Sequence, residues 1–424
     1  MAATRTGSKQ LLRDLNQSIV LNLLSERGPL SRTDLARQSG LPAATITRIA
    51  GDFLSAGLIA EASTAESSGG RRPTLLELTP GAGHVVGVKV REYGATLALC
   101  DLACGVVYQC EAPLPTDSSV GDAVRTIGAA IEHCIADSGV DRNRVLGAGV
   151  GLAGLIDSER GVCRHSSILG WRDEPLGPDL SRYLDMPVLI DNDVNTLAVA
   201  ERLFGAGRGV SDFLLVTVGR GIGLGIVIGG EIYRGARGWA GEFGHVALDT
   251  SPEAPLCNCG KRGCLETVAS DHGILRAATG ADPGHHVADA MEAVLARALA
   301  GDPDVIAIFH SAGAALGVAV ANLVNIFDPA LVVIGGEGLR AGELLLAPLR
   351  EALPRQLYGR SGDDVALAVR ATTDVEWARG AASLVLREVF RAPIYEMDED
   401  PVLDTLLAAR RRGAKRGVMR TAVS

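Results

Sequence analysis

Three cysteines fall within eight residues of this chain, and a histidine lies twelve residues before the first of them. The cysteines are Cys257, Cys259 and Cys264, and the histidine is His245. Three thiolates and one imidazole form the ligand set of a closed, tetrahedral zinc site. Because such a site leaves no open position for water, we predict a structural zinc that staples a loop rather than a catalytic metal. The alternative is a loop that carries free thiols.

The other cysteines of the eight show no such pattern. They lie in strand or helix patterns or in an isolated loop, where a free cysteine behaves as a small apolar side chain: Cys100, Cys104, Cys110, Cys134 and Cys163. The N-terminus lacks the apolar core of a signal peptide, and charged residues, amides or glycines interrupt the most apolar stretches. The sequence therefore predicts a cytoplasmic protein with reduced thiols and no membrane segment.

Composition excludes two broad classes of protein. Of the 424 residues 47% are apolar, so the chain can build a core and is not disordered. The formal net charge of −9 excludes a protein that is basic throughout. Residues 1–80 nevertheless carry 9 basic residues (Lys and Arg) against 7 acidic residues (Asp and Glu). The other 344 residues carry 32 basic and 43 acidic residues. This asymmetry predicts that residues 1–80 form a small head, which tolerates nucleic acid, and that the remaining residues form an acidic body.

Residues 1–80 have the pattern of a winged helix-turn-helix. Apolar spacing predicts three short helices, with breaks at Gly28 and Gly40. A capping box starts the second helix, and a proline suits the first turn of the third. Two short strands, 57–61 and 74–78, then predict a hairpin with a basic tip.

The third helix of this head would enter the major groove of operator DNA. Its inward face is apolar, so Ala44, Thr47 and Arg48 point outward toward the bases. At the hairpin tip, Arg71 and Arg72 reach the phosphates or a narrow minor groove. The low net charge of the head predicts modest affinity for each copy, and hence a dimer that reads two half-sites. The alternative is a protein-interaction module with a solvated arginine pair.

Residues 81–395 alternate strand-like apolar runs with helical stretches, which is typical of an α/β fold. The runs 85–90, 96–100 and 105–110 predict a meander of three strands. A later strand, 188–190, ends in Asp191-Asn192-Asp193, and ligands bind at this carboxyl edge of open α/β sheets.

Glycine clusters follow two further predicted strands. They are Gly219-Arg220-Gly221 and Gly335-Gly336. Each could bring backbone N–H groups to an anion. A tight turn explains each cluster equally well.

These segments together resemble the ROK family of repressors, open reading frames and sugar kinases. The resemblance covers nearly the whole chain and rests on four parts: the winged head, the segment 191–195 (Asp-Asn-Asp-Val-Asn), the segment 242–245 (Glu-Phe-Gly-His), and the cysteine signature 257–266 that ends in Glu266. It implies an actin- and hexokinase-like body of two RNase H-like lobes.

The resemblance also implies a division of the chain. The first lobe would span 81–191 and be rejoined by a C-terminal helix at 375–395. The second lobe, with the sugar and zinc sites, would span 192–374. Residues 396–424 would form a tail, which mixes acidic and basic residues and suits a solvated or frayed helix.

A sugar pocket is the main functional implication of the resemblance. Asn192, Asp193, Glu242, His245 and Glu266 would bind sugar hydroxyls, and Asp193 would be the general base in members that are kinases. Carboxylates and amides suit neutral polyols, since they accept and donate several hydrogen bonds at once. The histidine would hold zinc with one ring nitrogen and face the sugar with the other, so the zinc would fix its tautomer.

The chain departs from the family's kinases at two phosphate loops. Where kinases read Asp-x-Gly-Gly-Thr, this chain places Lys89 at the acid and Arg91 and Glu92 at the glycines. A side chain at Arg91 should block the approach of a phosphate to the backbone. The second loop, usually Gly-Thr-Gly, has Arg220 in place of the hydroxyl donor. These cations either form a spot for a phosphorylated sugar or pair with local carboxylates, and we favour the pairing.

The sequence therefore predicts a sugar-responsive DNA-binding regulator of carbohydrate metabolism, a repressor, that has lost kinase activity. We expect a homodimer or homotetramer in the cytoplasm, associated with the nucleoid, with a sugar or sugar phosphate as effector and no membrane partner. The main alternative is an ATP-dependent, glucokinase-like sugar kinase with a DNA-binding head. The sugar, the operator and the direction of the switch are not written in the sequence.

Overall fold

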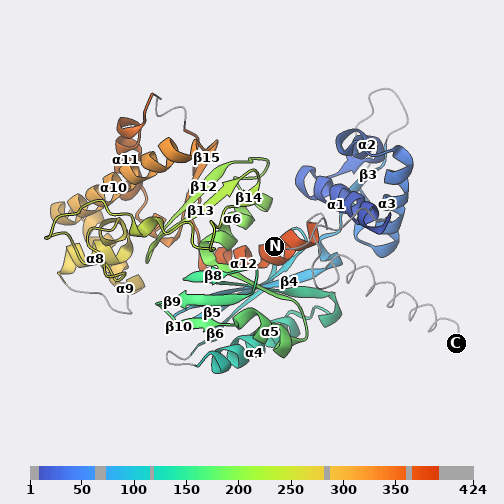
Figure 1. Ribbon diagram of the computed structural model, residues 1–424, viewed down its shortest axis with the longest axis horizontal. Coiled ribbons are helices and arrows are strands. Elements are labelled where there is room, and N and C mark those ends of the chain that lie inside the picture. Colours follow the sequence, from blue (N-terminus) through green and yellow to red (C-terminus); the bar gives the residue numbers. More distant parts are fainter. Residues whose placement is uncertain (1–8, 63–72, 115–118, 281–286, 360–364, 391–424) are drawn as a thin grey trace. The chain divides into compact units, whose positions relative to one another are not determined.

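The computed structural model describes residues 9–62, 73–114, 119–280, 287–359 and 365–390. The chain divides into two compact units (Figure 1). The first unit comprises Met1–Phe204 together with Trp377–Ser424, and the second comprises Gly205–Glu376.

The N-terminal part of the first unit combines helices with a small sheet. Its elements are α1 (Lys9–Arg27), β1 (Leu30–Ser31), α2 (Arg32–Ser39), α3 (Ala43–Ala56), β2 (Ile59–Ala62) and β3 (Leu75–Leu78). The strand order is β1-β3-β2, so the predicted hairpin gains a third, unpredicted strand. As the capping box predicts, Ser31 Oγ accepts the N–H of Asp34 at the start of α2.

The two faces of α3 divide as the sequence predicts. The inward apolar residues, among them Ile46 and Phe53, are fully buried. Ala44, Thr47 and Arg48 are exposed. The predicted wing residues Arg71 and Arg72 lie outside the described residues.

The main sheet of the first unit has the strand order β11-β7-β4-β5-β6. Its strands are β4 (His84–Arg91), β5 (Gly94–Asp101), β6 (Val106–Pro113), β7 (Val145–Leu152) and β11 (Val188–Asn192). β4, β5 and β6 form the predicted antiparallel meander. β4, β7 and β11 run parallel, so their carboxyl ends meet at one edge of the sheet.

Each face of this sheet is covered by different elements. On one face, alternate residues of β4 and β7, such as Val88 and Val150, share a buried core with α4 (Val120–Ser138) and α5 (Leu176–Leu184). On the other face the alternate residues of β7 are Gly147, Gly149 and Gly151. A Cβ at the last two would collide with or press on α12 (Asp374–Phe390) and α6 (Asp193–Phe204), so glycine lets these helices pack closely.

A second, smaller sheet lies in the first unit and was not predicted. It has the order β10-β9-β8, formed by β8 (Leu155–Asp157), β9 (Val162–Ser166) and β10 (Trp171–Glu174). Cys163, which the sequence predicts to behave as a small apolar side chain, is buried in β9.

The second unit is built on a sheet of order β14-β13-β12-β15-β16. Its strands are β12 (Phe213–Val218), β13 (Ile222–Ile228), β14 (Glu231–Ile232), β15 (Leu331–Gly335) and β16 (Leu367–Val369). The α-helices of this unit are α7 (Glu266–Ala269), α8 (Asp271–Thr279), α9 (Val287–Leu299), α10 (Pro303–Phe327) and α11 (Glu343–Ala352).

Among the described helices, α10 has the length and apolar composition that a membrane span would need. Half of the most apolar 18-residue stretch of this helix is buried inside the protein. A Cβ at Gly313 would lie 2.3 Å from the carbonyl oxygen of Leu345 in α11, so the two helices pack at close range. These are the properties of a core helix.

The boundary between the compact units differs from the expected lobe boundary. The resemblance implied a lobe boundary between 191 and 192, whereas the compact units divide at Phe204–Gly205 and at Glu376–Trp377. The reason is α6, which packs on the first sheet: a Cβ at Gly151 would lie 3.1 Å from Oγ1 of Thr196. Asn192 and Asp193 therefore belong to the first unit.

Candidate functional site

The predicted sugar ligands fall into two groups, one in each compact unit. Asn192 and Asp193 lie in the first unit, at the carboxyl edge where β4, β7 and β11 end side by side. Lys89 of β4 and Asp191 of β11 both pair with Gly151 of β7, so they are in register across the edge.

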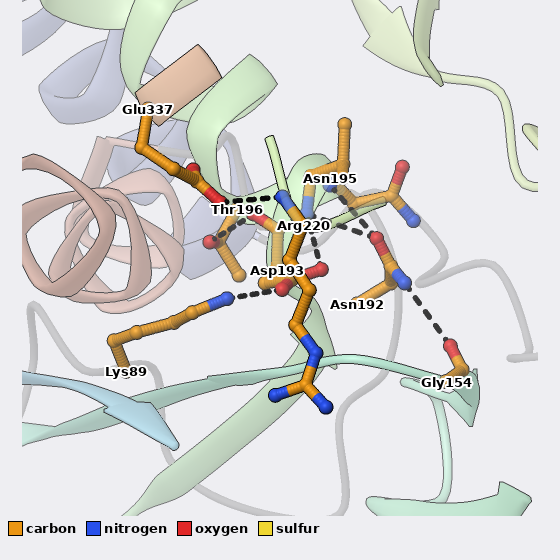
Figure 2. Close-up of polar contacts among 9 residues, drawn as sticks. Lys89, Gly154, Asn192, Asp193, Asn195, Thr196, Arg220 and Glu337 are labelled. Carbon is orange, nitrogen blue, oxygen red and sulfur yellow. Dashed lines mark hydrogen bonds and ion pairs between the residues drawn. The ribbon is translucent and has the colours of Figure 1, made fainter. Parts of the chain in front are cut away.

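The side chain of Asn192 starts α6. Its Oδ1 accepts the N–H of Val194 at 2.9 Å, and its Nδ2 donates to the carbonyl oxygen of Gly154 at 3.1 Å (Figure 2). The first contact is a helix cap at the start of α6. Asp191 is buried beneath, where its Oδ1 accepts the N–H of Asn192 and the Nδ2 of Asn195. Asn195 thus supports this edge, a role that the sequence motif alone does not show.

Asp193 and Lys89 form an ion pair through Oδ2 and Nζ (Figure 2). The two side chains are only 11% and 13% exposed, so both charges are largely removed from water. The other oxygen of Asp193, Oδ1, accepts the N–H of Val194 at 3.0 Å. The ammonium of Lys89 also lies 4.4 Å from the ring centroid of Trp377, a cation–π contact.

The structure shows local ion pairs for two of the substituted cations, Lys89 and Arg91. Lys89 pairs with Asp193, and Arg91 pairs with Glu111 at 3.4 Å. This agrees with the favoured interpretation of the sequence, in which local carboxylates take up these charges.

The second group contains the cysteine cluster. One ligand atom from each of His245, Cys257, Cys259 and Cys264 lies within 4.8 Å of the others. Cys257 Sγ is 3.6 Å from His245 Nδ1, and Cys259 Sγ is 3.6 Å from Cys264 Sγ. A tetrahedral zinc with Zn–S near 2.3 Å requires ligand atoms about 3.6–3.8 Å apart, so these four residues fit that ion.

Residues 257–264 fold into a tight loop around this cluster, which we call the knuckle. The N–H of Cys257 donates to the carbonyl oxygen of Lys261 at 2.8 Å, and Gly260 has the positive φ of +87° that the turn needs. Burial raises the pKa of the Cys257 thiol to about 12, so without a metal this thiol holds its proton. A cation would have to displace that proton on binding.

His245 has a different neighbour at each ring nitrogen. Nδ1 faces Cys257, whereas Nε2 lies 3.9 Å from Oε2 of Glu242. If Nδ1 held a metal, Nε2 would carry the proton on the side of the predicted sugar ligand Glu242. The backbone carbonyl oxygen of His245 also accepts Lys261 Nζ at 2.8 Å.

Glu266, the third predicted sugar ligand of this unit, begins α7. Its Oε2 accepts the N–H of Ile222 at 3.3 Å. A Cβ at Gly221 would lie 2.8 Å from the same oxygen and one at Gly244 would lie 3.2 Å from it, so both glycines make room for this carboxylate.

Sequence reasoning missed Glu337. This residue begins η4 (Glu337–Ala341), directly after the pair Gly335-Gly336. Its Oε1 accepts the N–H of Arg220 at 3.0 Å (Figure 2), and a Cβ at Gly219 would lie 2.1 Å from the same oxygen. A carboxylate of the chain itself therefore lies against the 219–221 turn, where the sequence suggested an anion. The sequence signal that could have identified Glu337 was an acidic residue directly after the pair Gly335-Gly336.

Asp271 lies next to the same turn and is 2% exposed. Its N–H donates to the carbonyl oxygen of Gly219, and its Oδ2 accepts Arg340 Nη2 at 2.6 Å. Burial raises the pKa of the Asp271 carboxyl to about 6, although the guanidinium of Arg340 acts in the opposite direction.

The folds and sites of the two units define an α/β protein with the body of a sugar kinase or of a regulator built on the same fold. A model described as "ROK family" matches residues 85–388, which is more than half of the chain. The chain belongs to the ROK family.

Three comparisons place it within that family. The "DNA-binding transcriptional dual regulator NagC" of Escherichia coli strain K12 is 31% identical over 391 residues, which cover 90% of this chain and 94% of NagC. A "Glucokinase" of Halalkalibacterium halodurans is 37% identical over 292 residues, 65% of this chain and 88% of that enzyme. A crystal structure of a ROK family transcriptional regulator, a homologue of the E. coli MLC protein, aligns with a TM-score of 0.78 at 26% identity over 94% of this chain and 100% of that one.

Proposed function

We propose that this protein is a sugar-responsive transcriptional repressor of carbohydrate metabolism that has lost the kinase activity of its enzyme relatives. The observation that carries the proposal is the ion pair between Lys89 and Asp193, because it engages the carboxylate that a kinase would need as a free base. The extent of the likeness supports it: the similarity to the regulator NagC spans 90% of the chain, and that to the glucokinase spans 65%.

Sugar recognition is assigned to both groups of polar residues. Asn192 and Asp193 would bind hydroxyls from the first unit, and Glu242, His245 and Glu266 from the second. Asn192 and Asp193 already hold structural contacts, which fix their orientation before a ligand arrives. The effector class is a neutral sugar or a sugar phosphate.

Loss of phosphoryl transfer is supported at two separate places. Lys89 holds Asp193, and Glu337 lies against the turn that would receive a phosphate. A carboxylate at this position repels a nucleotide phosphate and competes for the same N–H groups.

DNA recognition is assigned to the N-terminal winged helix-turn-helix. Ala44, Thr47 and Arg48 would face the bases, and Arg71 and Arg72 would contact the backbone or the minor groove. The exposed small residues of α3 allow close approach to the groove. A homodimer or homotetramer in the cytoplasm, associated with the nucleoid, would present two heads to a pseudo-palindromic operator.

A structural zinc is assigned to His245, Cys257, Cys259 and Cys264. When bound, the ion would supply a rigid staple for the knuckle and fix the tautomer of His245. The chain's own residues would then recognise the sugar: Nε2 of His245, which lies 3.9 Å from Oε2 of Glu242, would donate a hydrogen bond to a hydroxyl, and Glu242 would accept one.

The experiment that tests this function is calorimetry of the zinc-loaded protein against a panel of sugars and sugar phosphates, with and without a magnesium–nucleotide analogue. We expect one sugar class to bind and the nucleotide analogue to give no heat. Tight nucleotide binding coupled to the sugar would instead support the kinase alternative. Sugar-dependent formation of ADP that Asp193→Asn abolishes would establish that alternative.

A further inference from the structure

Lys89 is a largely buried cation, and its partners must offset the cost of removing its charge from water. Removing a charge from water is expensive, and an ion pair with apolar surroundings often gains little net stability. Lys89 nevertheless has two partners from different elements, the carboxylate of Asp193 in α6 and the ring of Trp377 in α12. The residue therefore joins the predicted sugar ligand to the C-terminal helix.

The helix α12 is fixed tightly to the strand that carries Lys89. A Cβ at Gly87, two residues before Lys89 on the same face of β4, would lie 1.9 Å from the carbonyl oxygen of Ala378. Ser383 Oγ lies 3.3 Å from the carbonyl oxygen of Thr196 in α6, to which it donates. Because backbone packs directly on backbone, α12 must move together with β4 and α6 and cannot move independently of the site.

The far end of α12 is bonded to the N-terminal head. The carbonyl oxygen of Phe390, the last residue of the helix, accepts Asn22 Nδ2 at 2.7 Å, and Asn22 lies in α1. From Trp377 to Phe390 the helix covers about 20 Å at 1.5 Å per residue. One rigid helix thus touches Lys89 near its start and the head at its end.

We infer that Lys89 is a positioning residue that couples sugar binding at Asp193 to the DNA-binding head through α12. A sugar hydroxyl bound by Asp193 competes with Lys89 for the same carboxylate. The ammonium then changes its place against Trp377, and α12 carries the change to Asn22. This inference rests on the proposed function, and it requires that the sugar bind two arrangements of this contact with different affinity.

The test measures coupling rather than binding alone. A duplex is first selected from a random-sequence pool by the full-length, zinc-loaded protein. Its Kd is then measured with and without a saturating concentration of the sugar found by calorimetry, and the ratio of the two values is the coupling. The variants are Lys89→Met, Lys89→Arg, Trp377→Leu and Asn22→Ala. The control is Arg91→Met, which removes the neighbouring cation of β4 and its pair with Glu111.

We expect a ratio of tenfold or more in the wild type and in Arg91→Met. In Lys89→Met, Trp377→Leu and Asn22→Ala the ratio falls below threefold, while each variant still binds the sugar and the duplex. Lys89→Arg keeps a cation and recovers part of the ratio. If a variant fails to fold, the fluorescence of Trp377 in the wild type serves instead: sugar must change the emission, and Trp377→Phe must remove that change.

Two failures are distinguishable. If the wild type responds to sugar and Lys89→Met and Asn22→Ala respond equally, the coupling role of Lys89 is wrong and the proposed function stands. If sugar binds but leaves the wild-type DNA affinity unchanged, the proposed function is wrong and the coupling falls with it.

Discussion

Gly149 of β7 lies directly beneath Ala381 of α12, so closely that a Cβ on the glycine would come within 1.9 Å of the alanine carbonyl oxygen. No real side chain tolerates such a separation from a backbone atom. Strand and helix can therefore pack in this way only while position 149 lacks a side chain.

Gly149→Ala should destabilise the first unit by several kcal/mol, about 2–5 by analogy with overpacked and strained cores, because α12 must move away from the sheet. Urea unfolding followed by circular dichroism measures this change. Gly121→Ala is the matched control, since a Cβ there meets Arg125 only at an ordinary 3.7 Å. Equal stability of the two variants would contradict the packing described here.

Cys259→Ser should release the metal from the knuckle. We expect about one zinc per chain in the wild type by atomic emission and much less in the variant, together with a lower melting temperature of the second unit. Cys110→Ser, which changes a cysteine of β6, is the control and should keep its zinc. Zinc affinity should also rise with pH, because burial raises the pKa of Cys257 to about 12 and the ion must displace that proton. A pH-independent affinity would argue against thiolate ligands.

Asp193→Asn should weaken sugar binding by about 10- to 100-fold, since hydrogen bonds to charged groups contribute about 1.5–3 kcal/mol. The helix start should survive, because Asn192 caps α6 independently. Calorimetry gives the affinity, and far-ultraviolet circular dichroism checks the fold. Unchanged affinity in a folded variant would remove Asp193 from the pocket.

Arg48→Ala should lower the affinity for the selected duplex by about 10- to 100-fold, as expected for loss of one base or phosphate contact. The matched control is Arg37→Ala on α2, whose guanidinium pairs with Asp34 at 2.7 Å. Fluorescence anisotropy at several salt concentrations measures both. If both variants lose affinity equally, α3 is not the helix that enters the groove. Binding that is insensitive to salt would favour the alternative of a protein-interaction module.

Asp271 should make the second unit less stable as the pH rises from about 4 to about 6. Its folded pKa of about 6 lies above the usual 3.8, so the folded state holds the proton more tightly than the unfolded state. The protonated carboxyl contributes its full stabilisation, about 3 kcal/mol, at a pH below its pKa in the unfolded state. This contribution is lost as the pH rises through its pKa in the folded state. Relative to Asp271→Asn, the wild type should therefore lose stability between pH 4 and pH 7. A constant difference between the two proteins would show that the carboxyl titrates normally.

Local patterns in the sequence predicted the features that depend on neighbouring residues. The meander of β4, β5 and β6 follows from apolar runs, and the buried face of α3 follows from helical spacing. The His245 cluster also follows from spacing, because three of its four ligands lie within one short loop.

Features that depend on distant residues were not predictable in the same way. Lys89 and Asp193 are 104 positions apart, and Glu337 and Arg220 are 117 apart, so only the order and register of the strands within each sheet bring them together. The small sheet of β8, β9 and β10 was not predicted for a different reason. Its strands carry charged residues such as Arg164 and Asp173 in place of an apolar run. The placement of α6 in the first unit depends on Gly151, which leaves room for Thr196 of that helix.

The most direct test of sugar-responsive repression is the Kd of the full-length protein for its selected duplex, measured with and without the sugar that it binds. We expect this sugar to change the Kd by tenfold or more, while sugars that do not bind leave it unchanged. A Kd that stays the same at saturating sugar, together with sugar-dependent turnover of ATP, would contradict it and identify the protein as a kinase.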